Sequence, residues 1–296
     1  MIPAPGPHGG DGTAVAAALG LDPASIVDLS VSLNPFAPDV AAVAGRHLEA
    51  LRQYPDRTAA TNVLAAAMGV DRARLMLTNG GSEAIALVAG ARGGTVLAEP
   101  EFSLHPRGDG PKWRSNPNNP TGRLAAASDT ADVWDEAFYP LATGRWTRGD
   151  AGAVVVGSLT KVFACPGLRL GYVVADDVGA LMREQPAWPV NGLALAMLAD
   201  LLRGVDLPGW RAAIASQRAA LADLLRRYEL RPQRSDAPWL LVEAPGLRDA
   251  LGPHGVVVRD CASFGLPGTV RIAVPDDRGL ERLDAALGAS RNEDES

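Results

Sequence analysis

The chain has 296 residues, of which 47% are hydrophobic and 21% are charged, and its formal net charge is -6. This length and composition allow a buried core divided into about two lobes. Because there is no basic stripe, nucleic acid is a poor candidate partner. No apolar run approaches the roughly twenty residues that cross a bilayer. The amino terminus also lacks the basic and apolar segments of a secretory signal.

The few cysteines and histidines bear on the cellular compartment and on metal binding. Only two cysteines are present, Cys165 and Cys261, which favours a reducing compartment, the cytoplasm. His47, His105 and His254 are scattered without the spacing of metal ligands, so no metal site is expected.

The predicted elements alternate along the first two thirds of the chain and then change in character. Strands are expected over 74–78, 95–98, 153–156 and 171–174, with a helix over 82–89, as in a largely parallel sheet buried on both faces. Further on we expect helices over 193–202, 210–228 and 278–287, and short strands over 239–242, 256–258 and 270–274. The second set predicts a smaller α+β lobe.

The first candidate motif lies where a predicted strand meets a predicted helix, at Asn79-Gly-Gly81. Glycines at such a turn let backbone N–H groups and a helix N-terminus face a phosphate. On its own the pattern fits an ordinary helix start equally well.

Two further motifs follow in chain order. The segment 116–122, Asn-Pro-Asn-Asn-Pro-Thr-Gly, is dense in turn-forming residues and by itself predicts only a tight loop. In Trp134-Asp-Glu-Ala-Phe138 an acidic pair follows a short apolar approach. A buried aspartate is costly unless a positive group pairs with it, and a protonated pyridine nitrogen is such a group. Asp135 would then keep the ring cationic and make it an electron sink.

The most informative motif is Ser158-Leu-Thr-Lys161, which is followed eight residues later by Arg169 and is flanked by two apolar runs. Desolvation or neighbouring positive charge makes a lysine amine a useful nucleophile. An aldehyde cofactor that carries a phosphate would explain the arginine, and pyridoxal phosphate meets both demands. Taken alone, the pattern also fits a solvated lysine or an acylating serine.

Together and in this order, the motifs resemble the class I/II aminotransferases, the fold-type-I enzymes that depend on pyridoxal phosphate, from about His8 to Val274. The resemblance implies an α/β fold with a mostly parallel sheet flanked by helices and a smaller α+β carboxyl-terminal domain. The expected parts are an amino-terminal arm joining the small domain, the cofactor-binding large domain, the small domain and a polar tail, at residues 1–35, 36–184, 185–290 and 291–296.

The resemblance also implies a role for each matching position. Lys161 would bind the cofactor aldehyde covalently and Asp135 would pair with the pyridine nitrogen, as the catalytic residues. Asn119 would hydrogen-bond the phenolic oxygen, and Phe102 would stack on the ring. The phosphate ligands would be Gly81, Ser82, Glu83, Ser158 and Arg169.

Tyr54 in Tyr-Pro-Asp56 matches a tyrosine that reaches the phosphate of the neighbouring subunit, which implies a homodimer; the alternative is packing in a turn. Many aminotransferases have tyrosine where this chain has Phe138. Without that hydroxyl, cofactor tuning should rest more heavily on Asn119.

Several segments of the sequence resemble one branch of the family in particular. The opening His8-Gly-Gly10, Phe138 and the segments 26–38 and 185–191 resemble the threonine-phosphate decarboxylases of cobalamin biosynthesis. The substrate would be a phosphorylated amino acid. By this analogy the substrate site would be formed by His8 and Asn34, with Arg259 on the phosphate and Arg271 on the carboxylate. His8 also lies in a Pro/Gly-rich arm where disorder is the default, and Arg259 also fits a surface strand.

Two alternatives stay open. Histidinol-phosphate aminotransferases are close relatives of that branch, and the two reactions differ in which bond at the alpha carbon is held perpendicular to the ring. Side-chain identities barely record such a difference. The segment 103–134 is also short for the strands and helix that the family normally has there, which leaves a catalytically degenerate protein that only binds pyridoxal phosphate as an alternative from another class.

Overall fold

The computed structural model describes residues 2–294, which divide into two compact units. The larger unit comprises Phe36–Asn119 and Leu124–Arg211, and the smaller comprises Met1–Pro35, Pro120–Arg123 and Ala212–Ser296. The arm therefore belongs with the smaller unit. Among the described residues, no helix combines the length and the apolar character needed to cross a membrane.

The larger unit is built on a six-stranded sheet. Its strands are β2 (Leu75–Asn79), β3 (Thr95–Val96), β4 (Lys112–Ser115), β5 (Val133–Asp135), β6 (Val154–Ser158) and β7 (Leu170–Val174). Their order is β2-β7-β6-β5-β4-β3, and β3 to β6 run parallel while β7 is antiparallel to both of its neighbours. The prediction of a mostly parallel sheet is confirmed.

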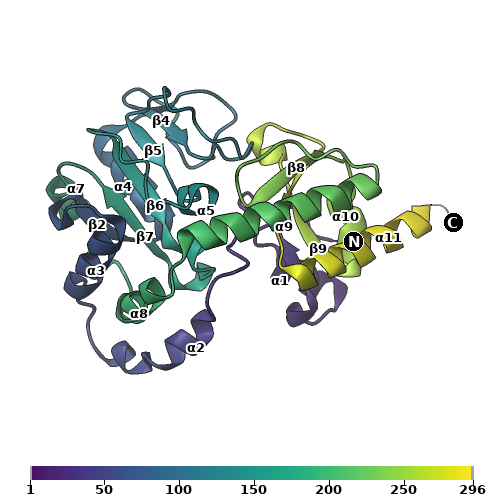
Figure 1. Ribbon diagram of the computed structural model, residues 1–296, viewed down its shortest axis with the longest axis horizontal. Coiled ribbons are helices and arrows are strands. Elements are labelled where there is room, and N and C mark those ends of the chain that lie inside the picture. Colours follow the sequence, from purple (N-terminus) through teal and green to yellow (C-terminus); the bar gives the residue numbers. More distant parts are fainter. Residues whose placement is uncertain (1, 295–296) are drawn as a thin grey trace. The chain divides into compact units, whose positions relative to one another are not determined.

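The helices of the larger unit pack on this sheet or on one another. They are α2 (Val40–Gly45), α3 (Thr58–Met68), α4 (Gly80–Arg92), α5 (Tyr139–Thr143), α6 (Leu159–Val162), α7 (Gly179–Glu184) and α8 (Gly192–Arg203). Figure 1 shows α4 lying along the sheet, where it packs on β6 and β7. Ile85 and Val88 of α4 bury their side chains against Met76, Val154 and Val173 of the strands. This contact fixes the helix that starts at the glycine turn.

Two stretches of the larger unit differ from the prediction. We predict residues 185–211 in the small domain, but they lie in the larger unit because α8 packs on α2 and α3. The short segment after Phe102 has no helix, as expected, yet it forms β4, a strand absent from the prediction. Trp113 of β4 is fully buried, which explains why so short a segment is held in the sheet.

The smaller unit has a four-stranded sheet in the order β1-β9-β10-β8. Its elements are α1 (Gly12–Leu19), β1 (Val27–Leu29), α9 (Leu207–Arg227, in this unit from Ala212 on), β8 (Trp239–Glu243), α10 (Leu247–Leu251), β9 (Val256–Asp260), β10 (Thr269–Ala273) and α11 (Asp277–Asp294). β1 pairs with β9 in parallel, which attaches the arm to the sheet.

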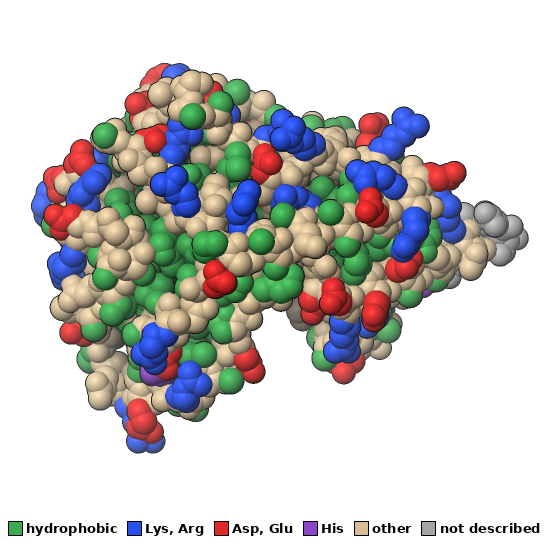
Figure 2. Space-filling view, in the orientation of Figure 1, with side chains coloured by type: hydrophobic (Ala, Val, Ile, Leu, Met, Phe, Trp, Pro, Cys, Tyr) green, Lys and Arg blue, Asp and Glu red, His purple; other side chains and the backbone are tan. Residues whose placement is uncertain are grey.

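Two long helices close the smaller unit. α9 and α11 lie side by side in Figure 1, and Arg227 pairs with Asp284 between them at 2.9 Å. Their apolar faces bury Leu221, Leu225 and Leu283 in the core of this unit. Residues 291–294 of the predicted polar tail continue α11, while 295 and 296 lie outside the described residues. Acidic and basic side chains intermingle on the face drawn in Figure 2, without a stripe of one sign.

Candidate active site

The glycine turn at the start of α4 forms a cradle with Arg169 and Ser158. Gly80 has a φ of +76°, and a Cβ there would lie 2.5 Å from Nη2 of Arg169. A Cβ at Gly81 would lie 3.3 Å from that of Ser158. The first turn of a helix directs unpaired N–H groups and a partial positive charge outward, and the guanidinium adds a full one. The structure thus brings together Gly81, Ser158 and Arg169, with Ser82 in the same helical turn.

The carboxylate of Glu83 is hydrogen-bonded within the protein. Its Oε2 accepts hydrogen bonds from the backbone N of Asn79 at 2.6 Å and from Nε2 of Gln185 at 3.1 Å. A carboxylate held in this way closes the turn into α4, and its negative charge would repel a phosphate. The side chain of Glu83 therefore shapes the turn, and a contact of this residue with the cofactor phosphate stays a prediction.

Lys161 lies in the short helix α6, directly after the fully buried strand β6. It is half-buried, and its Nζ lies 5.9 Å from the centroid of the Phe138 ring. The rigid strand and the aromatic neighbour fix a primary amine beside an apolar surface, as a nucleophilic lysine requires.

Asp135 ends β5 and is 8% exposed. Its Oδ2 lies 3.0 Å from Nε2 of His105, and Nδ1 of His105 lies 3.4 Å from Oε2 of Glu101. Burial disfavours the charged imidazole, but the hydrogen bond to Asp135 and the nearby carboxylate of Glu101 outweigh it and raise the pKa of His105 to about 9. The imidazole is therefore a cation at neutral pH, and it keeps a carboxylate in place at the end of the strand.

The predicted aromatic and amide residues lie in the same unit. Phe102 is half-buried and meets the His105 ring edge-on, with 5.7 Å between centroids. Asn119 is buried, and its backbone N–H donates to Oγ of Ser115 at 2.7 Å.

These residues fit pyridoxal phosphate by their chemistry. The amine of Lys161 suits its aldehyde, the carboxylate of Asp135 its ring nitrogen, and the cradle of Gly80, Gly81 and Arg169 its phosphate. When bound, this cofactor supplies an electron sink for negative charge at the alpha carbon of a substrate.

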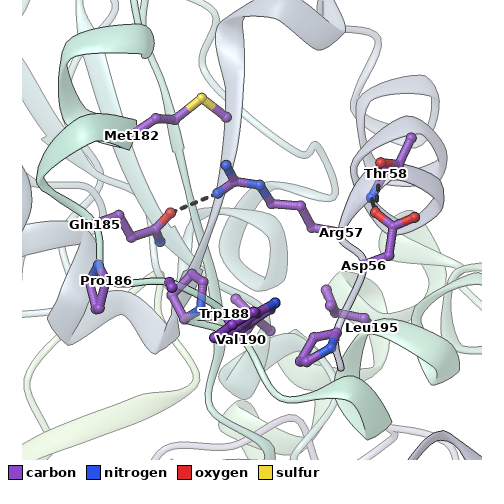
Figure 3. A pocket seen from close by; sticks show the side chains of 12 residues that line it. Asp56, Arg57, Thr58, Met182, Gln185, Pro186, Trp188, Val190 and Leu195 are labelled. Atoms are coloured by element: carbon purple, nitrogen blue, oxygen red, sulfur yellow. Dashed lines mark hydrogen bonds between the residues drawn. The ribbon is translucent and has the colours of Figure 1, made fainter. Parts of the chain in front are cut away.

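Tyr54 lies on the surface of the larger unit. It is 79% exposed and stacks on Trp188 with 4.5 Å between ring centroids. Beside it is a cavity of about 370 Å³, in which Figure 3 shows Arg57 extended toward Gln185, with a hydrogen bond of 2.8 Å between them. Gln185 also donates to the carbonyl of Leu77 in β2, so it connects this cavity to the sheet.

The predicted substrate residues all belong to the smaller unit. Arg259 and Arg271 are opposite each other in the paired strands β9 and β10, and both are buried. Asn34 is buried too, whereas His8 is exposed. Arg259 donates to the carbonyls of Gly6 and Pro7, and so ties down the arm just before His8.

The sequence prediction missed His105 and Glu101. A signal was present, since His105 follows the predicted ring-stacking Phe102 by three residues and Glu101 precedes it by one. The spacing of His105 from the other histidines argues against a metal site, and the motifs predict no other role for it.

Comparison with known proteins identifies the family. The sequence model of the family described as aminotransferase class I and II matches residues 113–287, which is more than half of the chain. The chain belongs to this family. It is 29% identical to a histidinol-phosphate aminotransferase of Thermobifida fusca over 88% of this chain and 89% of the relative. A histidinol-phosphate aminotransferase of Symbiobacterium thermophilum is 28% identical over 89% of this chain and 91% of the relative.

Solved structures agree on the fold. A histidinol-phosphate aminotransferase from Sinorhizobium meliloti in complex with pyridoxal-5'-phosphate matches with a TM-score of 0.79 and 16% identity, over 95% of this chain and 94% of that one. An L-threonine-O-3-phosphate decarboxylase from Porphyromonas gingivalis matches with a TM-score of 0.77 and 22% identity, over 90% of this chain and all of that one (100%). The protein is a pyridoxal-phosphate-dependent enzyme of fold type I, as predicted.

Proposed function

We propose that the protein decarboxylates an O-phosphorylated amino acid, L-threonine O-3-phosphate, as in the cobalamin-forming branch that its sequence resembles. One observation carries the proposal: Arg259 and Arg271 are paired across two strands, and their guanidinium carbons lie 5.5 Å and 5.9 Å from the ring of Phe264. Two guanidinium groups at one place suit a small molecule with two anionic groups, a carboxylate and a phosphate.

Arg271 is the stronger of the two candidates. Its guanidinium also lies 4.9 Å from the Trp239 ring, so aromatic faces hold it in a fixed orientation. Burial lowers its pKa to about 10, which leaves it a cation at neutral pH. A desolvated cation is stabilised most by an anion that accepts two hydrogen bonds from it, so we assign Arg271 to the substrate carboxylate.

Arg259 also holds the amino-terminal arm in place. Three of its hydrogen bonds go to the arm and to Ser263, whose Oγ lies 2.9 Å from Nη2. Its Nε has no hydrogen-bond partner among the described residues and stays available to a phosphate oxygen. We propose that Arg259, with Asn34 and with His8 on the arm that it anchors, contributes to recognition of the phosphate end of the substrate.

A second function has its own support. The curated relatives that cover about nine tenths of the chain are histidinol-phosphate aminotransferases, and an aminotransferase also handles a dianionic partner such as 2-oxoglutarate. Transamination of histidinol phosphate is therefore the competing proposal.

The two proposals separate in one experiment. The holoenzyme is incubated with L-threonine O-3-phosphate alone and, separately, with histidinol phosphate and 2-oxoglutarate. Release of carbon dioxide without a keto acid supports the decarboxylase, whereas formation of glutamate replaces it with the aminotransferase. If neither product forms while borohydride fixes the cofactor onto Lys161, a protein that binds the cofactor without turnover is the better description.

We also propose that the enzyme is a homodimer in which Tyr54 serves the neighbouring subunit. An exposed apolar patch on the larger unit supports this: Leu48, Leu51, Tyr54 and Trp188 are each more than half exposed. Such patches mark interaction surfaces.

The proposed location is the cytoplasm, which is supported by the two buried free thiols.

Mixed dimers test the shared site. Tyr54→Ala and Lys161→Ala proteins are each expected to be inactive or nearly so. If Tyr54 acts across the interface, mixing them restores one complete site per hybrid dimer, and activity rises toward a quarter of the wild-type level. No recovery after subunit exchange, verified by differently tagged chains, would exclude a shared site.

A further inference from the structure

Glu101 is a carboxylate buried inside the larger unit. Its side chain is 2% exposed. Oε1 accepts from the backbone N of Ser115 at 2.9 Å and from Nδ2 of Asn118 at 3.0 Å, while Oε2 accepts from Oγ of Ser115 at 2.5 Å. A carboxylate with this many donors is held in one orientation.

One branch of these contacts leads to Asp135. Oε2 of Glu101 lies 3.4 Å from Nδ1 of His105, whose Nε2 lies 3.0 Å from Oδ2 of Asp135. Nε2 of His105 is hydrogen-bonded to Asp135, and the carboxylate of Glu101 faces Nδ1 on the other side of the ring. The imidazole thus lies between two carboxylates, which fix its position from both sides.

The other branch leads to Asn119. Oγ of Ser115 donates to Glu101 and accepts the backbone N–H of Asn119 at 2.7 Å. Asn118, the residue before, donates its side-chain amide to the same carboxylate. The loop that presents the Asn119 side chain is thereby tied to Glu101 at two neighbouring positions.

We propose that Glu101 is a positioning residue that couples the carboxylate assigned to the cofactor's ring nitrogen, Asp135, to the amide assigned to its phenolic oxygen, Asn119. The inference rests on the cofactor roles proposed for these two residues, and it does not depend on which substrate is used. The residues assigned to the ring nitrogen and to the phenolic oxygen then both depend on one buried carboxylate.

The groups around His105 show that Glu101 is the residue to substitute in a test. The charged groups that face the imidazole are Glu101 and Asp135, and its other neighbours are the rings of Phe102 and Trp113. Arg107 donates to the backbone carbonyls of His105, at 2.7 Å, and of Glu101, at 3.2 Å, and pairs with Glu99, which itself accepts from the backbone N of Glu101. Glu99 is therefore part of the surroundings of the network, and the exposed Asp109 of the same segment is the better control carboxylate.

The test compares Glu101→Gln with Asp109→Asn as holoenzymes, in the absence of substrate. Proton-detected NMR of ¹⁵N-labelled histidine follows His105 among the four histidines, and absorbance follows the bound cofactor as a function of pH. We expect Glu101→Gln to lower the pKa of His105 by about one unit or more and to shift the pH at which the cofactor absorbance changes. Asp109→Asn should leave both titrations unchanged.

A third variant separates the two branches and guards against misfolding. Ser115→Ala removes the connection that runs from Glu101 through Oγ of Ser115 to Asn119, leaves the one through Asn118, and keeps the Glu101 carboxylate facing His105. We expect it to alter the cofactor absorbance or affinity at constant pH while the His105 titration stays as in the wild type. The proposal is overturned if Glu101→Gln, folded by circular dichroism, leaves the cofactor titration unchanged, or if Ser115→Ala has no effect on the cofactor.

Discussion

The imidazole of His105 is hydrogen-bonded to the carboxylate of Asp135 at 3.0 Å, although thirty positions separate the two residues in the chain. The strand β5 ends at Asp135, and the segment that follows Phe102 folds back so that His105 meets it. The contact gives the carboxylate of Asp135 a fixed orientation, which is what its assigned partner, a pyridinium nitrogen, needs.

Replacement of Asp135 by asparagine should therefore impair catalysis more than folding. An opposite charge of this kind shifts a partner's pKa by roughly two units, so we expect kcat to fall about a hundredfold. Asp132→Asn is the control, because Asp132 directly precedes the same strand, is exposed, and accepts a backbone hydrogen bond from Lys112 at 2.7 Å that asparagine can also accept. Equal kcat values in the two variants would remove Asp135 from the reaction.

The charge on His105 should make stability depend on pH. Its pKa is about 9 in the folded protein against an ordinary value of 6.5, so the bound proton favours the folded state. This contribution is complete below pH 6.5 and is lost as the pH rises through 9; its upper limit is about 3 kcal/mol. Urea unfolding between pH 6 and 10 measures it. His105→Gln should flatten the profile, while His47→Gln, at the surface beside Asp200, should not.

Glu136 should destabilise the protein at high pH. Burial raises the pKa of its carboxyl from 4.5 to about 7, and its Oε2 has no hydrogen-bond partner among the described residues. The stabilising proton is fully bound below pH 4.5 and is lost as the pH rises through 7. Glu136→Gln should thus raise the free energy of unfolding by about 1–3 kcal/mol at pH 8.5 and change it little at pH 5. The same gain at both pH values would contradict this explanation.

Gly80 should be essential for cofactor binding because of space as well as backbone conformation. Gly69→Ala is a matched control, since Gly69 has a similar φ of +67° but no atom within 4 Å of a Cβ, whereas a Cβ at Gly80 meets Arg169. Both variants carry the cost of a left-handed alanine, about 1 kcal/mol. Only Gly80→Ala should displace the guanidinium and raise the Kd for pyridoxal phosphate tenfold or more, by roughly 1.4 kcal/mol. Similar Kd values would exclude Arg169 as a phosphate ligand.

Arg271→Ala should raise KM for the anionic substrate by roughly 10- to 100-fold, because a charged hydrogen bond contributes about 1.5–3 kcal/mol. Arg278→Ala, at an exposed position in the same unit, is the control. Initial rates at several substrate concentrations measure the change, and an unaltered KM would mean that Arg271 does not bind the substrate.

Local motifs allowed most of the fold and part of the site to be predicted. The strand before Asn79, the helix after it and the lysine after β6 are each defined by neighbouring residues, so their periodicity and glycines were sufficient. The structure also brings Gly81, Ser158 and Arg169 together, a set that the family resemblance implied and the glycine turn alone did not.

Contacts between distant segments could not be predicted in this way. β4 exists because Trp113 is buried between strands, although the Pro/Gly content around it indicates a loop. The partner of Glu83 is Gln185, which lies 102 positions away, so its distance from the motif concealed its role. The positions of Glu101 and His105 likewise depend on how the chain returns to the sheet after β3.

The two buried thiols have a practical consequence. Burial raises the pKa of both Cys165 and Cys261 to about 11, so almost no thiolate exists at neutral pH and maleimides or iodoacetamide should leave the native chain unmodified. A cysteine introduced at any exposed position would be labelled selectively without replacing either native residue. One dye on each unit would then allow energy-transfer measurements of their separation during turnover.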